Sequence, residues 1–217
     1  MKQAGIKLAS VLALVAFAVA PMASASLVNP GFEDGNAMPN VDVGGAPGWG
    51  TFEFAFTTEQ AARGGAGQQS LKLYGPFFPG GASGAFQSIP VSPGDTVAAS
   101  VWGFDAGDAD PDGLKGNNFG LMILQFFNGS NNIGEVLSPQ INSSAPDQVW
   151  VELTASGVAP AGTTSAQILL LHIQANNPVT GGSVFFDDAS LAVVAIPEPG
   201  AALALATLLP LAGRRRR

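Results

Sequence analysis

The stretch from residue 26 to residue 195 most constrains the fold, because it is a succession of short strand-like segments separated by turns. Gly, Pro, Asn and Asp gather at residues 92–95, 128–132, 159–162 and 176–178, where these residues favour turns. Only residues 59–63 favour a short helical turn. Nine segments are expected to be strands: 49–56, 70–74, 85–91, 96–105, 119–128, 134–137, 148–156, 165–174 and 183–194. Many strands and almost no helix predict an all-β fold, an antiparallel two-sheet sandwich.

The strands differ in how their apolar residues are arranged. Residues 119–127 and 166–173 are apolar on both faces, which is typical of central strands. Residues 149–155 alternate instead: Leu153 and Ala155 share one face, and Trp150 shares the other with Glu152. This alternation predicts a strand with one buried and one exposed face.

The first 25 residues have the layout of a secretory signal peptide. Lys2 and Lys7 form a positive beginning, residues 8–20 an apolar run, and Ala23-Ser24-Ala25 a small-residue cleavage motif. Cleavage is expected after Ala25, so residues 1–25 are excluded from the fold.

The last 22 residues, 196–217, have three parts: Pro197-Glu198-Pro199, an apolar run at residues 201–212, and Gly213 followed by four arginines. The prolines interrupt regular structure, and the arginines resist translocation across a membrane. The run is shorter than the roughly 20 residues of an unstrained membrane span and contains Pro210, which favours a transient signal over a lasting anchor. A last core helix is the alternative, but such a helix would show a polar face.

This tail resembles the PEP-CTERM sorting signal of proteins exported by Gram-negative bacteria. The resemblance implies that an exosortase-type membrane protease recognises Pro197, Glu198 and Pro199, removes the tail and passes the protein to the cell surface or extracellular matrix. The resemblance covers only the tail, so it implies a destination and says nothing of activity.

Charge is distributed unevenly along the chain. Residues 26–195 hold three basic and fifteen acidic residues, a formal charge of −12, and the other six basic residues lie in the two ends. A body this acidic repels phosphate backbones, which excludes nucleic-acid binding, and it suits cation binding. The chain has no cysteine, so disulfides do not stabilise it. Its length suits one domain with one core.

The body also resembles carbohydrate-binding modules and galactose-binding-like jelly rolls. The resemblance rests on residues 27–35 with Gly48-Trp49 at the start, on residues 87–102 in the middle, and on residues 184–191 at the end. It implies a jelly-roll sandwich that associates with extracellular polysaccharide. In addition, the turn at residues 29–31 is expected to direct Phe32 into the core.

In those families a structural calcium ion often lies between the first and last strands. The matching acids here are Glu33 and Asp187 or Asp188. Calcium prefers six to eight oxygen ligands, so backbone carbonyls would complete the site. Adjacent aspartates on a strand point to opposite faces, so only one of the pair is expected to point inward. The alternative is that these acids lie at a solvated strand end.

A second calcium candidate is the acidic segment at residues 105–113. Asp108, Asp110 and Asp112 form a D-x-D-x-D-G pattern, the first half of an EF-hand calcium loop. The second half is missing, because the twelfth position is Phe119 and not a glutamate. A weak calcium site and a solvated acidic loop are both compatible with this pattern.

Three aromatic residues are candidates for stacking on sugar rings. Trp150 lies on the polar face of its strand, Trp102 precedes the acidic segment, and Tyr74 lies at a strand end. The alternative for each is packing within the sandwich. The glycine-rich residues 75–84 form a loop that either shapes a site or connects strands.

Signs of catalysis are few. His172 is the only histidine and lies in an apolar strand, where packing is the ordinary role, and neither a G-x-S-x-G nor an H-E-x-x-H motif occurs. We therefore expect a non-catalytic, exported protein that binds extracellular polysaccharide. The alternatives are a structural or adhesive matrix protein without a sugar site and, third, a glycan-active hydrolase.

Overall fold

The computed structural model describes residues 26–37, 41–64, 67–175 and 180–194, and in these ranges the chain is all-β. In this part of the chain no helix is long or apolar enough to cross a membrane. The strands are β1 (Val43–Gly44), β2 (Gly50–Phe52), β3 (Ala55–Thr58), β4 (Ser70–Tyr74), β5 (Ala82–Pro90), β6 (Thr96–Phe104), β7 (Phe119–Asn128), β8 (Asn131–Leu137), β9 (Ile141–Asn142), β10 (Val151–Val158), β11 (Ser165–Ile173) and β12 (Ser183–Val194).

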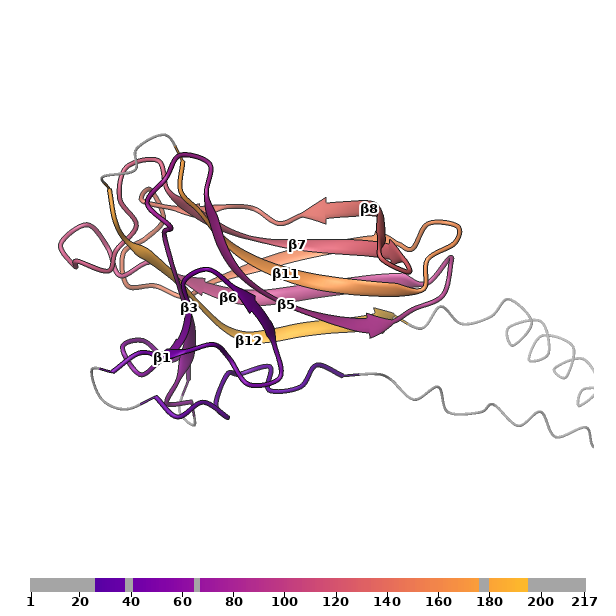
Figure 1. Cartoon of the computed structure of the whole chain (residues 1–217), viewed down its shortest axis with the longest axis horizontal. Coiled ribbons are helices and arrows are strands. Elements are labelled where there is room, and N and C mark those ends of the chain that lie inside the picture. Colours follow the sequence, from indigo (N-terminus) through magenta and orange to yellow (C-terminus); the bar gives the residue numbers. More distant parts are fainter. Residues whose placement is uncertain (1–25, 38–40, 65–66, 176–179, 195–217) are drawn as a thin grey trace, which may run out of the picture.

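The strands form two antiparallel sheets packed face to face as a jelly-roll sandwich (Figure 1). Sheet I has the strand order β1-β3-β4-β12-β6-β10, and sheet II has the order β2-β5-β11-β7-β8, with β9 pairing β7. Neighbouring strands are mostly far apart in sequence, as in the pairs β12–β6 and β11–β5. The expected two-sheet sandwich is confirmed.

Most expected strands are present, and the expected bounds of β4, β7 and β12 are confirmed. The prediction of a single strand at residues 49–56 is wrong, because Glu53 adopts a φ of 54° and the chain turns there. As a result β2 joins sheet II and β3 joins sheet I. The short strands β1 and β9 were not expected from the sequence.

The helical turn expected at residues 59–63 is also absent from the structure. The Gln60 amide N–H donates to Thr58 Oγ1, and the Arg63 amide N–H donates to Asp187 Oδ2 at 2.8 Å. These bonds to a side chain of β3 and a side chain of β12 replace the backbone bonds of a helical turn.

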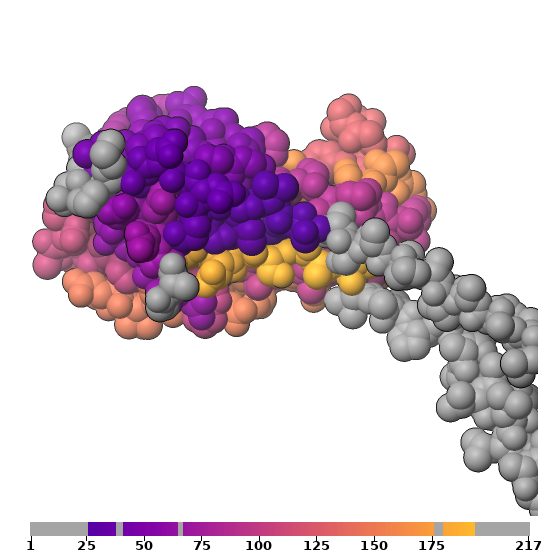
Figure 2. All heavy atoms as spheres, turned by 90° about the horizontal axis from the view of Figure 1, so that it is seen from below, coloured from indigo at the N-terminus to yellow at the C-terminus, as the bar shows by residue number. Residues whose placement is uncertain are grey.

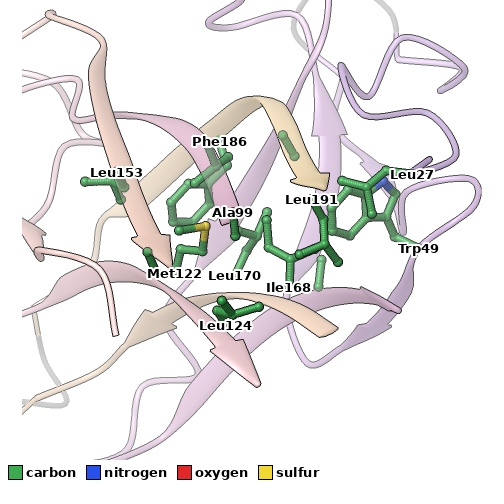
Figure 3. Close-up of a cluster of buried hydrophobic side chains, with 14 of the residues drawn as sticks. Leu27, Trp49, Ala99, Met122, Leu124, Leu153, Ile168, Leu170, Phe186 and Leu191 are labelled. Atoms are coloured by element: carbon green, nitrogen blue, oxygen red, sulfur yellow. The ribbon is translucent and has the colours of Figure 1, made fainter. Parts of the chain in front are cut away.

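The core lies between the sheets and follows the two-residue period of the strands (Figure 3). Met122 and Leu124 of β7 and Ile168 and Leu170 of β11 point toward sheet I and are fully buried. Burying one such side chain contributes about 1.5–3 kcal/mol relative to leaving it in water. In β10, Leu153 and Ala155 are buried while Trp150, just before the strand, and Glu152 lie on the outer face, which confirms the expected alternation.

The first described segment packs beside the last strand. Phe32 is fully buried and its ring centroid lies 5.0 Å from that of Trp49, which confirms that the turn at residues 29–31 directs Phe32 inward. The Ala189 amide donates to the Pro30 carbonyl at 2.8 Å. Figure 2 shows the indigo N-terminal segment lying along the yellow β12 at the surface.

The two described ends of the chain lie at one end of the sandwich (Figure 1). Val194 pairs with Thr96, the first residue of β6, whereas residues 105–118 follow Phe104 at the other end of the same strand. Residues 75–81 also leave β4 at this other end, because Tyr74 pairs with Ser183. We call this second end the loop end.

Candidate functional site

The outer face of sheet II carries a row of apolar side chains that the described elements leave partly exposed. The strand register places Phe86 beside Leu169, Leu169 beside Ile123, and Ile123 beside Leu137. Phe86 and Leu137 are 37% and 52% exposed. Phe52, also 37% exposed, lies next to this row on β2. We call these five residues the aromatic face.

Two glycines set the orientation of the phenylalanine rings. Gly50 pairs with Phe86 and Gly84 pairs with Phe52 across the β2–β5 ladder. A Cβ atom added to Gly50 would lie 2.5 Å from the Phe86 ring, and one added to Gly84 would lie 2.5 Å from the Phe52 ring. Each ring therefore lies over the bare backbone of the neighbouring strand, an arrangement that stabilises glycine within a sheet.

A row of polar side chains runs parallel to the apolar row, one pleat away. Ser88, Gln167, Gln125 and Glu135 are neighbours in register across the four strands β5, β11, β7 and β8. Gln167 Nε2 donates to Ser88 Oγ at 3.1 Å, and Gln125 Nε2 is 3.4 Å from Glu135 Oε2. The face therefore places flat apolar surface next to hydrogen-bonding groups, which suits a ligand with one apolar and one hydroxylated side.

The three aromatic residues expected to stack on sugars lie elsewhere, on the outer side of sheet I. The Arg63 guanidinium carbon lies 3.7 Å from the centroid of the Trp102 ring, so it covers one ring face. Trp150 packs on Phe104, with ring centroids 5.0 Å apart. Tyr74 packs edge to face on the ring of Phe77 at 5.1 Å. Each ring thus has a packing partner, and their sugar contacts stay predictions.

The acidic segment at residues 105–113 is held by lysines. Lys115 Nζ donates to the carbonyl oxygens of Asp108 and Asp110 at 2.6 and 2.9 Å. Asp112 Oδ1 lies 3.0 Å from Nζ of Lys72. Ammonium groups thus lie where a calcium ion would need oxygen ligands, and calcium binding by this loop stays a prediction.

The acids near the first and last strands do converge. Glu33, Asp187 and Asp188 surround Gly31, and a Cβ atom on this glycine would lie 3.6–3.8 Å from an atom of each. Only one of the two aspartates is buried: Asp187 is 1% exposed while Asp188 is exposed. Asp187 pairs with Trp102 on the outer side of sheet I and bonds the Arg63 amide, so the expectation that it points between the sheets is not confirmed. Asp188 φ is 48° at the bulge that follows Asp187.

Each of these acids already has a hydrogen-bond or ion-pair partner. Asp187 accepts the amide N–H groups of Arg63 and Asp188 at 2.8 and 2.7 Å, and Asp188 forms an ion pair with the Arg63 guanidinium. Glu33 accepts the amide N–H groups of Gln68 and Gln69. Among the described residues no three acidic or histidine side chains are arranged to hold a metal. The residues as placed do not form a calcium shell, and a calcium ion here stays a prediction.

Two buried groups have shifted pKa values. Burial raises the pKa of Asp187 to about 6. Hydrogen bonds from the Arg63 and Asp188 amides oppose this rise, and the charges of Asp188 and Glu33 add a smaller rise. Burial lowers the pKa of His172 to about 4. His172 is fully buried, and neither ring nitrogen has a hydrogen-bond partner among the described residues. It is neutral at pH 7 and has no contact typical of a catalytic base.

The aromatic face was not expected from the sequence, although one signal pointed to it. Strands 119–127 and 166–173 are apolar on both faces, yet a two-sheet sandwich covers only one face of each strand. Part of this second face is buried within the fold, since Leu121 and Leu171 are 4% and 8% exposed, and the row that includes Ile123 and Leu169 stays partly exposed. Phe52 and Phe86 themselves gave no local signal, because they meet only through the pairing of β2 with β5.

No family model matches the sequence, and no curated protein matches it. The fold is similar to that of solved carbohydrate-binding modules. For the CBM22-1 xylan-binding domain of Paenibacillus barcinonensis Xyn10C the TM-score is 0.50 at 16% identity, covering 82% of this chain and 100% of that one. For TmCBM61 in complex with β-1,4-galactotriose the TM-score is 0.50 at 13% identity, covering 78% and 99%.

Other similar structures have different roles. The Stig cyclase Fisc of Fischerella sp. TAU has a TM-score of 0.55 at 16% identity, covering 80% of this chain and 100% of that one. A match to the enzymatically active domain of bacteriophage CBA120 tailspike protein 4 (TM-score 0.51, 14% identity) covers 78% of this chain but only 21% of that domain. At these identities the similarity shows the fold alone, one that carbohydrate-binding modules share with a cyclase.

Proposed function

We propose that this protein is a non-catalytic module that binds extracellular polysaccharide on the aromatic face. One observation carries the proposal: Phe52 and Phe86 lie over glycines, remain exposed, and stand next to a row of polar side chains. An aromatic ring stacks on the apolar side of a pyranose, while amide and carboxylate groups bond its hydroxyls. The similarity to a xylan-binding domain and to a galactotriose-bound module supports the ligand class.

The exposure of the apolar row supports the same proposal. Exposed apolar patches on soluble proteins mark interaction surfaces. The polar row consists of Ser88, Gln167 and Gln125, with one charged residue, Glu135, at its end, and such a row is more suited to a neutral, hydroxylated polymer than to a charged one.

The test is a glycan array on residues 26–195, followed by affinity electrophoresis in gels containing each polysaccharide that binds. Phe86→Ala should weaken binding at least about tenfold, which corresponds to about 1.4 kcal/mol. Val158→Ala is the matched control, since Val158 is 63% exposed on the edge strand of the other sheet and should bind normally. Circular dichroism would verify that both variants are folded.

Two results would overturn the proposal. A flat array would favour a structural or adhesive matrix protein without a sugar site. Binding that survives Phe52→Ala and Phe86→Ala together, but is lost on changing Trp150 or Trp102, would move the site to sheet I.

We also propose that residues 1–25 and 196–217, which lie outside the described residues, direct export. On this proposal a signal peptidase cuts after Ala25, and an exosortase-type protease reads Pro197, Glu198 and Pro199, so that the body reaches the cell surface or matrix. Mass spectrometry of the protein recovered from a Gram-negative host with such a protease would give both termini. Recovery of a form ending in the four arginines would contradict processing of the tail.

A further inference from the structure

A second concave site lies on the outer side of sheet I, across the sandwich from the aromatic face. Residues of the acidic loop and of the segment after β3 cover part of this side at the loop end and leave an open pocket of about 550 Å³. Its lining includes the rings of Phe104 and Phe185, the carboxylates of Asp110 and Asp112, and the side chains of Gln60 and Gln148. Its volume lies within the range of small-molecule sites.

The aromatic part of the lining is fixed by sheet pairing. Phe104 of β6 and Phe185 of β12 are register partners, and their rings meet edge to face with centroids 5.8 Å apart. Trp150 supports Phe104 from the other side at 5.0 Å. Phe185 is buried at the bottom of the pocket, whereas Phe104 is partly exposed. The packed rings give the pocket an apolar floor whose accessible part is Phe104.

The carboxylates of the pocket outnumber its cations. The lining includes no lysine or arginine among the described residues. Two ammonium groups lie next to the lining. Lys72 is 5% exposed and lies 3.0 Å from both Asp42 and Asp112, so two carboxylates balance its one charge. Lys115 donates to the backbone carbonyl of Asp110 at 2.9 Å and forms no ion pair with the Asp110 carboxylate. Asp110 Oδ1 accepts the Asp112 amide N–H at 2.9 Å, and its other oxygen has no partner among the described residues.

The two amides of the pocket have unused hydrogen-bonding groups. Gln60 Oε1 accepts a hydrogen bond from Lys72 at 2.7 Å, which leaves the Gln60 NH₂ group to donate. The Gln148 side chain makes no hydrogen bond to a described residue, while its backbone amide donates to Asp105 and holds the residue at the rim. Amide donors and acceptors of this kind bond sugar hydroxyls.

We propose that this pocket binds an amino sugar unit carrying a protonated amine. The ammonium group pairs with Asp110 and Asp112, because charge-assisted hydrogen bonds to carboxylates are stronger than neutral ones. The electron-rich face of an aromatic ring attracts the same cation and accepts the apolar side of the sugar ring. The two glutamine amides bond hydroxyl groups. Acidic sugars are excluded by repulsion, and a bare metal ion would leave the aromatic floor unused.

The test is titration calorimetry of residues 26–195 with a glucosamine tetramer, at a pH where its amines are protonated. An N-acetylglucosamine tetramer of the same length is the uncharged control ligand. The glucosamine tetramer should bind at least about tenfold more tightly than the acetylated one, a difference of about 1.4 kcal/mol. Val158→Ala, at the end of β10 that pairs with Thr96 and is therefore distant from the pocket, should leave this binding unchanged. Loss of tetramer affinity in Asp110→Asn supports the pocket, whereas loss in Phe86→Ala alone would assign the tetramer to the aromatic face and overturn the inference.

Two variants examine the pocket itself. Asp110→Asn keeps the Oδ1 acceptor for the Asp112 amide, so it should fold normally while losing at least about tenfold in affinity. Gln148→Asn tolerates the positive φ of 57° at this position and should also weaken binding. Asp34→Asn is the matched control, since it removes the same charge from an exposed residue away from the pocket and should bind normally.

Several outcomes would overturn the inference. These are no binding of the glucosamine tetramer, equal binding of the two tetramers, or an equal loss in Asp34→Asn and Asp110→Asn, which would indicate general attraction of a cation to an acidic protein. A lysine tetrapeptide that binds as tightly as the glucosamine tetramer, and with the same dependence on Asp110, would show that the pocket recognises ammonium groups and not amino sugars.

Discussion

At the scale of single residues, His172 and Asp187 make stability depend on pH in opposite directions. The unfolded chain protonates His172 near pH 6.5, but the folded protein does so only near pH 4. Between these values the unfolded state holds more protons, so the contribution of His172 to stability is lost as pH falls. For Asp187 the unfolded value is 3.8 and the folded value about 6, so the folded state holds more protons and stability is lost as pH rises.

We expect these two effects to oppose each other between pH 4 and pH 6. Relative to the parent protein, His172→Leu should become less stable as pH rises through this window, and Asp187→Asn should become more stable. Urea denaturation of all three proteins at pH 4, 5, 6 and 7 measures the difference in unfolding free energy. Variant curves parallel to the parent curve would contradict the assigned pKa values.

At the scale of elements, the strand pair β2–β5 determines whether the aromatic face is flat. The three atoms nearest to a Cβ on Gly50 all belong to the Phe86 ring, so Gly50→Ala should displace that ring without moving backbone. We expect polysaccharide binding to weaken as in Phe86→Ala, although Phe86 is unchanged. Affinity electrophoresis measures the loss, and Gly44→Ala, with nothing within 4 Å of the added Cβ, is the matched control.

Alanine at Gly84 should affect the stability of the fold more than alanine at Gly50. A Cβ there would lie 2.5 Å from the Phe52 ring and 2.8 Å from the backbone oxygen of Leu170, which cannot rotate away. Gly84→Ala should therefore destabilise the fold by about 1–3 kcal/mol, whereas Gly50→Ala should cost less. Equal thermal stability of the two variants would contradict this account of the β2–β5 pair.

The loop between β6 and β7 is organised by Lys115. Its ammonium group bonds carbonyl oxygens of the acidic segment, and Asp105 Oδ1 accepts the amide N–H groups of Gly107 and Leu114 at 3.1 and 2.8 Å. We expect calcium to bind this loop weakly, because the ion must compete with Lys115 for these oxygens.

Lys115→Met should therefore lower the calcium Kd of the loop by at least about tenfold. Titration calorimetry of the parent and the variant, each freed of metal with a chelator, measures the change. Magnesium is the control ion, because it demands a more regular oxygen geometry and should gain less. A variant that binds no calcium at millimolar concentration would refute the loop as a calcium site.

At the scale of the whole molecule, the described strands and core lie between Leu27 and Val194. The two faces with candidate sites are on opposite sides of the sandwich, and both described ends of the chain lie away from the loop end. A body attached through either end would thus leave the pocket on sheet I and the aromatic face accessible to polymers.

We expect the ends to contribute little to stability. Residues 26–195 and residues 26–217, the latter in mild detergent, should have melting temperatures within about 2 °C in the same buffer, because the described core is complete without the tail. Differential scanning calorimetry makes the comparison, and Phe32→Ala, which empties a fully buried position, is the positive control. A much lower melting temperature for residues 26–195 would mean that the tail packs on the body.

The sequence by itself determined the strands and their inner faces. Residues 70–74, 119–128 and 183–194 were predicted with the bounds they have, and the alternation around Leu153 correctly separated core from surface. These features depend on local properties, namely the two-residue period of a strand and the turn preferences of glycine, proline and asparagine. Even so, the turn at Glu53 was missed, because a positive φ there has no sequence signature.

Only the tertiary structure decided which surfaces are open and which charges are paired. Phe52 and Phe86 become a platform because β2 pairs with β5, and Trp102 is covered because Arg63 reaches it from another segment. The acidic loop has half of a calcium-loop pattern in its sequence, but the contacts of Lys72 and Lys115 with it depend on the fold. The physical reason is that exposure and ion pairing arise from contacts between residues far apart in the chain, which strand periodicity does not encode.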